Sequence, residues 1–532
     1  MIRRFVAVAL LGICLPASAV GQTMEFSEEE VEEGQAKSSE TSDGKLAEKM
    51  AKAVSLSDNE KYRQASRLFY EIIQKAGDTP RGQEARFELG KTLYRMELYQ
   101  GALAQFGRIV EAGEGHPYFI PTLRGLLSLM DVLSADPALR EYLAAYAERF
   151  PREVPEESRD RYAYYVGRYF HSELSVDRAA EMFDAVDRDS PYFGKARYIK
   201  GITYVANYQA EPAVSAFKTV LRHLVDEREQ RGGLTQEQQK LRELTHLAMA
   251  RVFYSTGDYK TSLKYYDKVK RESPRWAKAL FEKAWAYFQT DAYNEALGNL
   301  HSLNSPFFAN AYFPEGPILS GLLYFYNCRY DQVRRELETF ERMYQGLKGD
   351  MQAVLDTHSD ATAMFEWYQR LRAGEVDLDR RVYRILQSAV DDRQVQSAVE
   401  LVGLADEELA KMESMPKSWR DAPLGQTLLQ EASVAQSFAI DEAGSLIRQR
   451  LERQVRELDR LINEKKRILI EVAKAEKGAI EADIRAGQRV ERDDQEAPLK
   501  VTDEDLYWKF RGEYWRDELG HYVFNVESRC KR

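Results

Sequence analysis

Few residues of this sequence stand in arrangements that perform catalysis or bind a metal. Residues 90–92 (GKT) end like a phosphate-binding loop, but Ala85 occupies the place of the first glycine that such a loop needs. Residues 113–115 (GEG) lack the third glycine of a dinucleotide-binding turn. The seven histidines are dispersed, and no HExxH, CxxC or GxSxG motif occurs. The sequence therefore predicts no catalytic residues, no metal site and no cofactor.

The composition is that of a large, acidic chain with few reactive side chains. The 532 residues include 76 lysines and arginines against 86 aspartates and glutamates, which gives a formal charge of −10. A duplex-binding protein usually carries a basic surplus, so nucleic acid is not a predicted partner. Three cysteines are too few for a disulfide framework. The sequence leaves open whether Cys328 and Cys530 pair.

The first nineteen residues have the three parts of a secretory signal peptide. A basic head at residues 1–4 precedes the apolar run 5–15, and residues 17–19 (ASA) provide a cleavage site. We therefore expect export to the bacterial periplasm, with cleavage near Ala19. The alternatives are an N-terminal membrane anchor, for which the apolar run is short, and an outer-membrane lipoprotein formed on Cys14, which is disfavoured because the preceding Ile13 is bulky.

No later stretch approaches the roughly 18 apolar residues that span a bilayer, so no transmembrane helix is expected in the mature chain. Residues 20–45 follow the leader and are rich in glutamate, serine and glycine. Clustered like charges and few apolar residues favour disorder. We predict a disordered acidic arm.

From residue 46 to 347, small and aromatic residues recur about every 34 residues. In the repeat that starts at Asp160, Gly167 is at place eight, Phe170 at place eleven, Ala179 at place twenty and Phe183 at place twenty-four. The same offsets return, with substitutions, in about eight repeats that start near residues 46, 83, 120, 160, 194, 243, 277 and 314.

This pattern predicts two antiparallel helices in each repeat. Small residues at places eight and twenty let the helices approach closely, and the rings at places eleven and twenty-four fill the gap toward the next pair. A hairpin of this size is stable only when it is stacked on its neighbours, which produces a solenoid. Residues 46–347 resemble the tetratricopeptide-repeat (TPR) family, and the resemblance implies an all-α fold whose concave face binds protein segments.

In this register, the first helix of each repeat places cations and aromatic rings along the concave groove. The predicted groove residues are Lys91, Arg161, Arg168, Lys195, Arg251 and Lys278, together with Tyr94, Tyr164, Tyr198 and Tyr254. A cation-lined groove in an acidic protein favours acidic protein segments as ligands. The alternative is that the cations are ordinary solvated positions and that the tyrosines are packing residues.

Beyond residue 350 the repeat offsets stop. Residues 350–490 are predicted to form long helices, with Leu451, Val455 and Leu458 in an apolar stripe. This stripe fits either a homodimeric coiled coil or a helix folded back within one chain. Residues 491–532 are predicted to be a linker and an aromatic C-terminal segment, in which the alternation of Tyr522 and Phe524 with other residues allows a short strand.

Residues 512–520 (GEYWRDELG) resemble a tail found in exported TPR proteins of myxobacteria and their relatives, a group that includes components of the adventurous gliding machinery. The resemblance implies a non-catalytic periplasmic scaffold that binds other envelope proteins within an envelope-spanning assembly, with gliding motility as one such process. The alternatives are a helper of outer-membrane or peptidoglycan assembly, and an enzyme whose site forms between the helical region and the C-terminal segment.

Overall fold

The computed structural model of the chain describes residues 42–134, 136–150, 152, 154–390, 392–485 and 512–530. The predicted leader, the acidic arm as far as residue 41 and the linker as far as residue 511 lie outside these residues. Residues 42–45 were predicted to belong to the arm, but they form the first turn of helix α1. The helical part therefore begins before residue 46.

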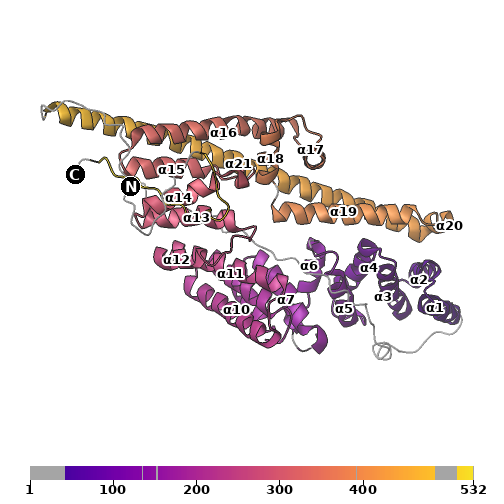
Figure 1. Cartoon of the computed structure of the whole chain (residues 1–532). Helices are drawn as coiled ribbons and strands as arrows, with labels where there is room; N and C mark the ends of the chain where they lie inside the picture. The colour runs from indigo at the N-terminus through magenta and orange to yellow at the C-terminus, as the bar shows by residue number, and fades with distance from the viewer. Residues whose placement is uncertain are drawn as a thin grey trace. The chain divides into compact units, whose positions relative to one another are not determined.

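Paired helices occupy the region in which the sequence predicts repeats (Figure 1). Each pair consists of two helices joined by a short connection. The pairs are α1 (Ser42–Asp58) with α2 (Tyr62–Ala76), α3 (Pro80–Arg95) with α4 (Tyr99–Glu111), α5 (Phe119–Leu129) with α6 (Pro137–Ala144), α7 (Arg159–Ser172) with α8 (Val176–Asp184), α9 (Phe193–Ala206) with α10 (Ala210–Arg231), α11 (Gln236–Ser255) with α12 (Tyr259–Tyr266), α13 (Trp276–Gln289) with α14 (Tyr293–Leu303), and α15 (Glu315–Tyr326) with α16 (Tyr330–Thr357). The predicted all-α solenoid of helical hairpins is confirmed.

A left-handed residue ends the first helix in seven of these pairs. Place fifteen of the repeat has a positive φ in each of them, at Glu60, Glu97, Leu174, Tyr208, Gly257, Asp291 and Cys328. The next residue closes the turn: the Ser175 N–H donates to the Phe170 carbonyl at 2.9 Å, and the Arg329 N–H donates to the Tyr324 carbonyl at 3.0 Å. This is the Schellman bond that usually accompanies glycine at a helix end. Six of the seven residues are not glycine, so the packed hairpin imposes the turn on them.

Glycine at place eight makes room for the phenylalanine at place twenty-four. A Cβ atom added to Gly167 would lie 2.7 Å from the Phe183 ring, and both residues belong to the same pair. Phe106 fits closely against Gly90 of its own pair and Gly125 of the next, at 2.5 Å and 2.6 Å from the Cβ atoms that would be added. The ring at place twenty-four therefore joins the two helices of a pair as well as successive pairs.

The chain divides into two compact units, and each is described by itself. Unit 1 contains α1–α9, α10 as far as Val220, and three later elements as far as Gly444: α19 (Arg393–Glu413), α20 (Lys417–Arg420) and the beginning of α21 (Pro423–Arg485). Unit 2 contains the rest of α10, helices α11–α16, α17 (Ala361–Ala373), α18 (Arg380–Val390), α21 from Ser445 onward, and residues 512–530, which we call the tail.

In unit 1, the later helices pack on the second helices of the first two pairs. The Glu408 carboxylate of α19 is 4% exposed and accepts the backbone N–H groups of Gln100 and Gly101, at 2.8 Å and 3.1 Å. Nε1 of Trp419 donates to Oγ of Ser66 at 3.3 Å. Because Gln100 and Gly101 lie in the first turn of α4, the carboxylate satisfies amides that have no partner within that helix.

In unit 2, the long helix α21 is folded back along α16 (Figure 1). Leu451, Val455 and Leu458 of its apolar stripe are buried in the single chain. Nζ of Lys348 on α16 lies 2.5 Å from a carboxylate oxygen of Asp459 on α21. These contacts favour the folded-back alternative over a dimeric coiled coil.

The tail contains no strand, although the alternation around Tyr522 and Phe524 allowed a short one. The Phe524 N–H donates to the backbone carbonyl of Asn294 at 3.1 Å, so helix α14 supplies the acceptor that a neighbouring strand would have supplied. Cys530 forms a disulfide with Cys328, with the two Cα atoms 5.1 Å apart and a separation of 202 positions in sequence. The structure thus answers the question of cysteine pairing that the sequence left open.

Candidate partner-binding groove

The ten predicted groove residues lie on the first helices of their pairs and fall in both units. Unit 1 holds Lys91, Tyr94, Arg161, Tyr164, Arg168, Lys195 and Tyr198, and unit 2 holds Arg251, Tyr254 and Lys278. The structure therefore presents two sets of groove residues, which are taken in turn.

In unit 1, two of the predicted cations are neutralised by carboxylates of the chain itself. Nζ of the buried Lys91 lies 2.8 Å from Oε1 of Glu88, one turn earlier in the same helix. Nη2 of Arg161 lies 2.6 Å from Oδ1 of Asp131, which comes from the preceding pair. An acidic partner segment would have to compete with these carboxylates.

The remaining predicted residues of unit 1 are mostly packing residues. Tyr164 and Tyr198 are 1% and 0% exposed, so their rings lie in the core. The guanidinium carbon of Arg168 lies 5.7 Å from the centre of the Tyr164 ring, within the range of a cation–π contact. Lys195 and Tyr94 are half-buried. Protein surroundings raise the pKa of the Tyr94 hydroxyl, so this side chain is partly withdrawn from water.

In unit 2, Arg251 forms the most completely buried ion pair among the predicted residues. Its Nε and Nη2 atoms donate to the two carboxylate oxygens of Glu282 at 2.9 Å and 2.8 Å. The Tyr266 hydroxyl donates to the same carboxylate at 3.2 Å. Half-buried Tyr254 packs edge-on against Tyr259 with ring centres 5.4 Å apart, and burial raises its pKa to about 12.

Lys278 differs from the other predicted cations because it is exposed. The surrounding protein displaces water from around its ammonium group and, together with the positive charges of Arg251 and Arg450, lowers its pKa. Arg450 comes from α21, and its Nε donates to the Ala389 carbonyl at 2.9 Å. Lys278, Arg251 and Arg450 form a group that we call the cation cluster.

Sequence reasoning missed Glu282, Asp131 and Arg450. The two carboxylates each lie about one repeat length from the arginine that they bind, so a search for opposite charges at that separation would have found them. Arg450 lies far along the chain in a helix outside the repeats, and no sequence signal connects it with Lys278.

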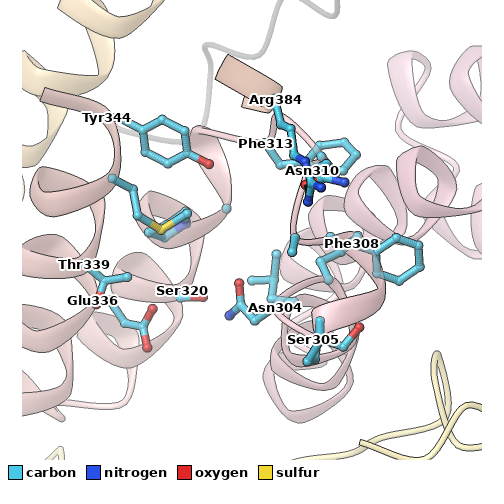
Figure 2. A pocket seen from close by; sticks show the side chains of 18 of the residues that line it. Asn304, Ser305, Phe308, Asn310, Phe313, Ser320, Glu336, Thr339, Tyr344 and Arg384 are labelled. Atoms are coloured by element: carbon cyan, nitrogen blue, oxygen red, sulfur yellow. Dashed lines mark hydrogen bonds between the residues drawn. The ribbon is translucent and has the colours of Figure 1, made fainter. Parts of the chain in front are cut away.

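Unit 2 also contains a cavity of about 830 Å³ between α14, α15, α16 and the start of α18. Figure 2 shows Glu336 and Thr339 of α16 on one side of the hollow and Asn304, at the end of α14, on the other. Arg384 closes one edge, where its Nη1 donates to the side-chain oxygen of Asn310 at 3.4 Å. Burial raises the pKa of the Glu336 carboxyl from its ordinary value of 4.5 to about 7, against the effect of Arg335.

The raised pKa of Glu336 makes stability depend on pH in a specific direction. Between pH 4.5 and 7 the folded chain still holds a proton that the unfolded chain has released, so the free energy of unfolding falls as pH rises. Glu336→Gln should remove this penalty. In urea titrations the variant should gain about 2 kcal/mol over the wild type at pH 8 and close to nothing at pH 4.5. Glu338→Gln, an exposed change in the same helix, is the control, and equal gains at both pH values would contradict the prediction.

Within the described residues, no group of three or more His, Cys, Asp or Glu side chains is arranged to hold a metal ion. None of the helices in the described part of the chain combines the length and the apolar character that crossing a membrane requires.

Comparison with known families supports the repeat. The tetratricopeptide repeat family model matches residues 50–117 and 247–299, so one matched segment lies in each unit. These segments fall in the hairpins α1–α4 and α11–α14. No curated protein matches the chain.

Several solved structures are similar to the chain at low identity. A tetratricopeptide repeat protein from Parabacteroides merdae is 14% identical over 56% of this chain and 93% of that one, with a TM-score of 0.24. The apo quorum sensor NprR from B. thuringiensis is 12% identical over 76% of this chain and 99% of that one, with a TM-score of 0.29. Yeast Tom70 is 12% identical over 82% of this chain and 97% of that one, with a TM-score of 0.22. Likenesses at this level carry no information about function.

Proposed function

Because the chain is a tetratricopeptide-repeat protein, we propose that it is a non-catalytic scaffold that binds protein partners in the bacterial periplasm. We place it in an envelope-spanning assembly, with gliding motility as the process that it serves. Repeat solenoids typically use extended surfaces to bind protein segments, and no catalytic family matches the chain. The gliding role rests on the resemblance of residues 512–520 alone.

The observation that carries the binding role is the cation cluster of unit 2. Lys278 is exposed, but the surrounding protein withdraws its ammonium group from water, and this desolvation, together with the positive charges of Arg251 and Arg450, lowers its pKa. Two carboxylates offset part of this charge: Glu282 binds Arg251, and Oδ2 of Asp392 lies 3.5 Å from Nε of Arg450. An acidic side chain or a C-terminal carboxylate of a partner would relieve the remaining repulsion, so we propose an acidic protein segment as the ligand.

The disulfide between Cys328 and Cys530 supports the periplasmic part of the proposal. Structural disulfides persist in oxidising compartments and are rare in the bacterial cytoplasm. Labelling of intact cells with a thiol-reactive polymer, followed by denaturation and electrophoresis, tests this point. An exported chain should keep both thiols protected until a reductant is added, and a chain with two free thiols in growing cells would overturn the proposal of export.

Lys278→Glu should remove partner binding while leaving the fold intact. The Lys278 side chain is exposed, whereas Arg251→Glu would remove the guanidinium from a buried ion pair and place two carboxylates together. Crosslinking in intact cells, with identification of partners by mass spectrometry, measures this loss. Lys278→Glu should recover at least about fivefold less partner than the wild type, which corresponds to a loss of about 1 kcal/mol of binding free energy.

Lys260→Glu is the matched control for this experiment. Lys260 is an exposed lysine on α12, the second helix of the neighbouring pair, and its replacement makes the same change in charge. Partner recovery should remain at the wild-type level in this variant. Equal recovery with Lys278→Glu and Lys260→Glu would rule out the cation cluster as the binding site.

A further inference from the structure

The tail is held on unit 2 mainly through its own backbone. The N–H groups of Gly520 and Val526 donate to Oγ of Ser302 and to the side-chain oxygen of Asn294, at 2.8 Å and 2.9 Å. Nε of Arg329 donates to the Glu527 carbonyl at 3.0 Å. Contacts of this kind are those by which a protein surface binds an extended peptide.

The order of these contacts shows that the tail runs antiparallel to α14. Gly520 meets Ser302, the carbonyl of Tyr522 meets Gly298, and Val526 meets Asn294, so each step forward in the tail is a step back along the helix. At its far end, the Arg529 N–H donates to the Asn327 carbonyl at 3.0 Å, next to the disulfide. We call the surface formed by Asn294, Gly298, His301, Ser302, Asn327 and Arg329 the tail-binding face.

Side chains at the centre of this face give it specificity. The ring of His301 lies 4.8 Å, 5.0 Å and 5.4 Å from the ring centres of Tyr514, Tyr522 and Phe524, so three aromatic residues of the tail surround one residue of α14. Leu519 is 2% exposed. The face therefore recognises a segment with aromatic side chains at set positions.

Glycine is required on the helix side of the contact. A Cβ atom added to Gly298 would lie 1.6 Å from the backbone oxygen of Tyr522, and the next nearest atoms, at 2.4 Å and 3.1 Å, also belong to the tail backbone. An alanine at this position thus excludes the tail backbone from its present place on α14.

In sequence, 26 residues separate Arg485, the last residue of α21, from Gly512, where the tail begins. Fully extended, that length spans on the order of 80 Å. We propose that the tail-binding face also binds the tail of a second copy of the chain, and that the two arrangements exchange when the disulfide is open. Exchange preserves every contact described above and closes a symmetric pair, as in other swapped dimers. This inference does not depend on the proposed periplasmic role.

Two single-cysteine chains test the exchange, with Cys14→Ser present in both. The donor carries Cys328→Ser and keeps Cys530, and the acceptor carries Cys530→Ser and keeps Cys328. Glutathione disulfide is the oxidant: two protein thiols become one protein disulfide, and the oxidant takes up the two electrons and two protons to become two glutathione molecules. With the two chains tagged differently and mixed in equal amounts, a Cys328–Cys530 bond can form only between copies.

We expect mixed disulfide dimers to exceed the two kinds of homodimer combined by at least about fivefold, with the Cys328–Cys530 peptide pair identified by mass spectrometry. Random collision would give equal amounts, and that result would overturn the proposal. Gly298→Ala in the acceptor should bring mixed dimers down to the random level, whereas the same change in the donor, which frees the donor's own tail, should not lower their amount. Gly346→Ala in the acceptor, at an open position of α16, is the matched control, and a loss of mixed dimers there would also count against tail exchange.

Discussion

Replacing Arg251 with alanine should lower the free energy of unfolding of unit 2 by about 3–5 kcal/mol, because the loss of one partner leaves a buried charge uncompensated. The side chains of Arg251 and Glu282 are 8% and 14% exposed, and the guanidinium holds both carboxylate oxygens. Tyr266, which donates to Glu282, is part of a hydrophobic cluster with Ala250 and Ala279. Such surroundings solvate a lone carboxylate poorly. Urea unfolding measures the loss, and hydrogen exchange of the α11 and α13 amides locates it.

The control for Arg251 is a more exposed ion pair in the same unit. Lys348 and Asp459 are 30% and 49% exposed in their side chains, so Lys348→Ala should cost less than about 1 kcal/mol. The double change Arg251→Met with Glu282→Leu should recover most of the stability, since it removes both charges and fills the space with apolar groups. A loss for Arg251→Ala no larger than that for Lys348→Ala would show that the buried pair is not a major source of stability.

The repeat could be predicted from sequence because its packing demands particular sizes at particular places. A side chain larger than hydrogen at Gly167 would collide with Phe183, so glycine and phenylalanine mark places eight and twenty-four. Place fifteen shows no such pattern in its residue types, although its backbone has a positive φ in seven repeats. Leu174 and Cys328 adopt a left-handed conformation there, and their side chains give no indication of it. At this place the packing of the hairpin outweighs the preference of these residues for a negative φ.

The sequence predicted which cations and tyrosines lie on the first helices, but not which of the cations are neutralised by carboxylates of the chain. The register placed Arg161 and Arg251 on the first helices correctly, yet charge along one helix says nothing about the carboxylate that the next pair presents. The charge of Arg450, on a helix outside the repeats, is one of the causes that lower the pKa of Lys278. The cavity beside Glu336 depends on α18 as well as on three repeat helices, so it belongs to the tertiary structure alone.

Opening the disulfide should produce the second large effect, a loss of about 2–4 kcal/mol from the stability of unit 2. The bond closes a loop of 202 residues, and in the unfolded chain such a closure removes many conformations. Cys328→Ser with Cys530→Ser should therefore lower the urea midpoint of unit 2. The amides of Phe524, Val526 and Arg529 should also exchange faster, because their hydrogen bonds to Asn294 and Asn327 then hold the tail without a covalent anchor.

A reductant separates the effect of the covalent bond from that of the substituted side chains. Added to the wild type, it should shift the urea midpoint to that of the double-serine variant, and added to the variant it should change nothing. If the variant unfolds at the wild-type midpoint, the loop closure contributes nothing to the stability of unit 2. The noncovalent contacts of the tail would then be enough to hold it on the tail-binding face. If instead the midpoint falls but the tail amides stay protected, the tail-binding face holds its ligand without the disulfide, which is the property that exchange between copies requires.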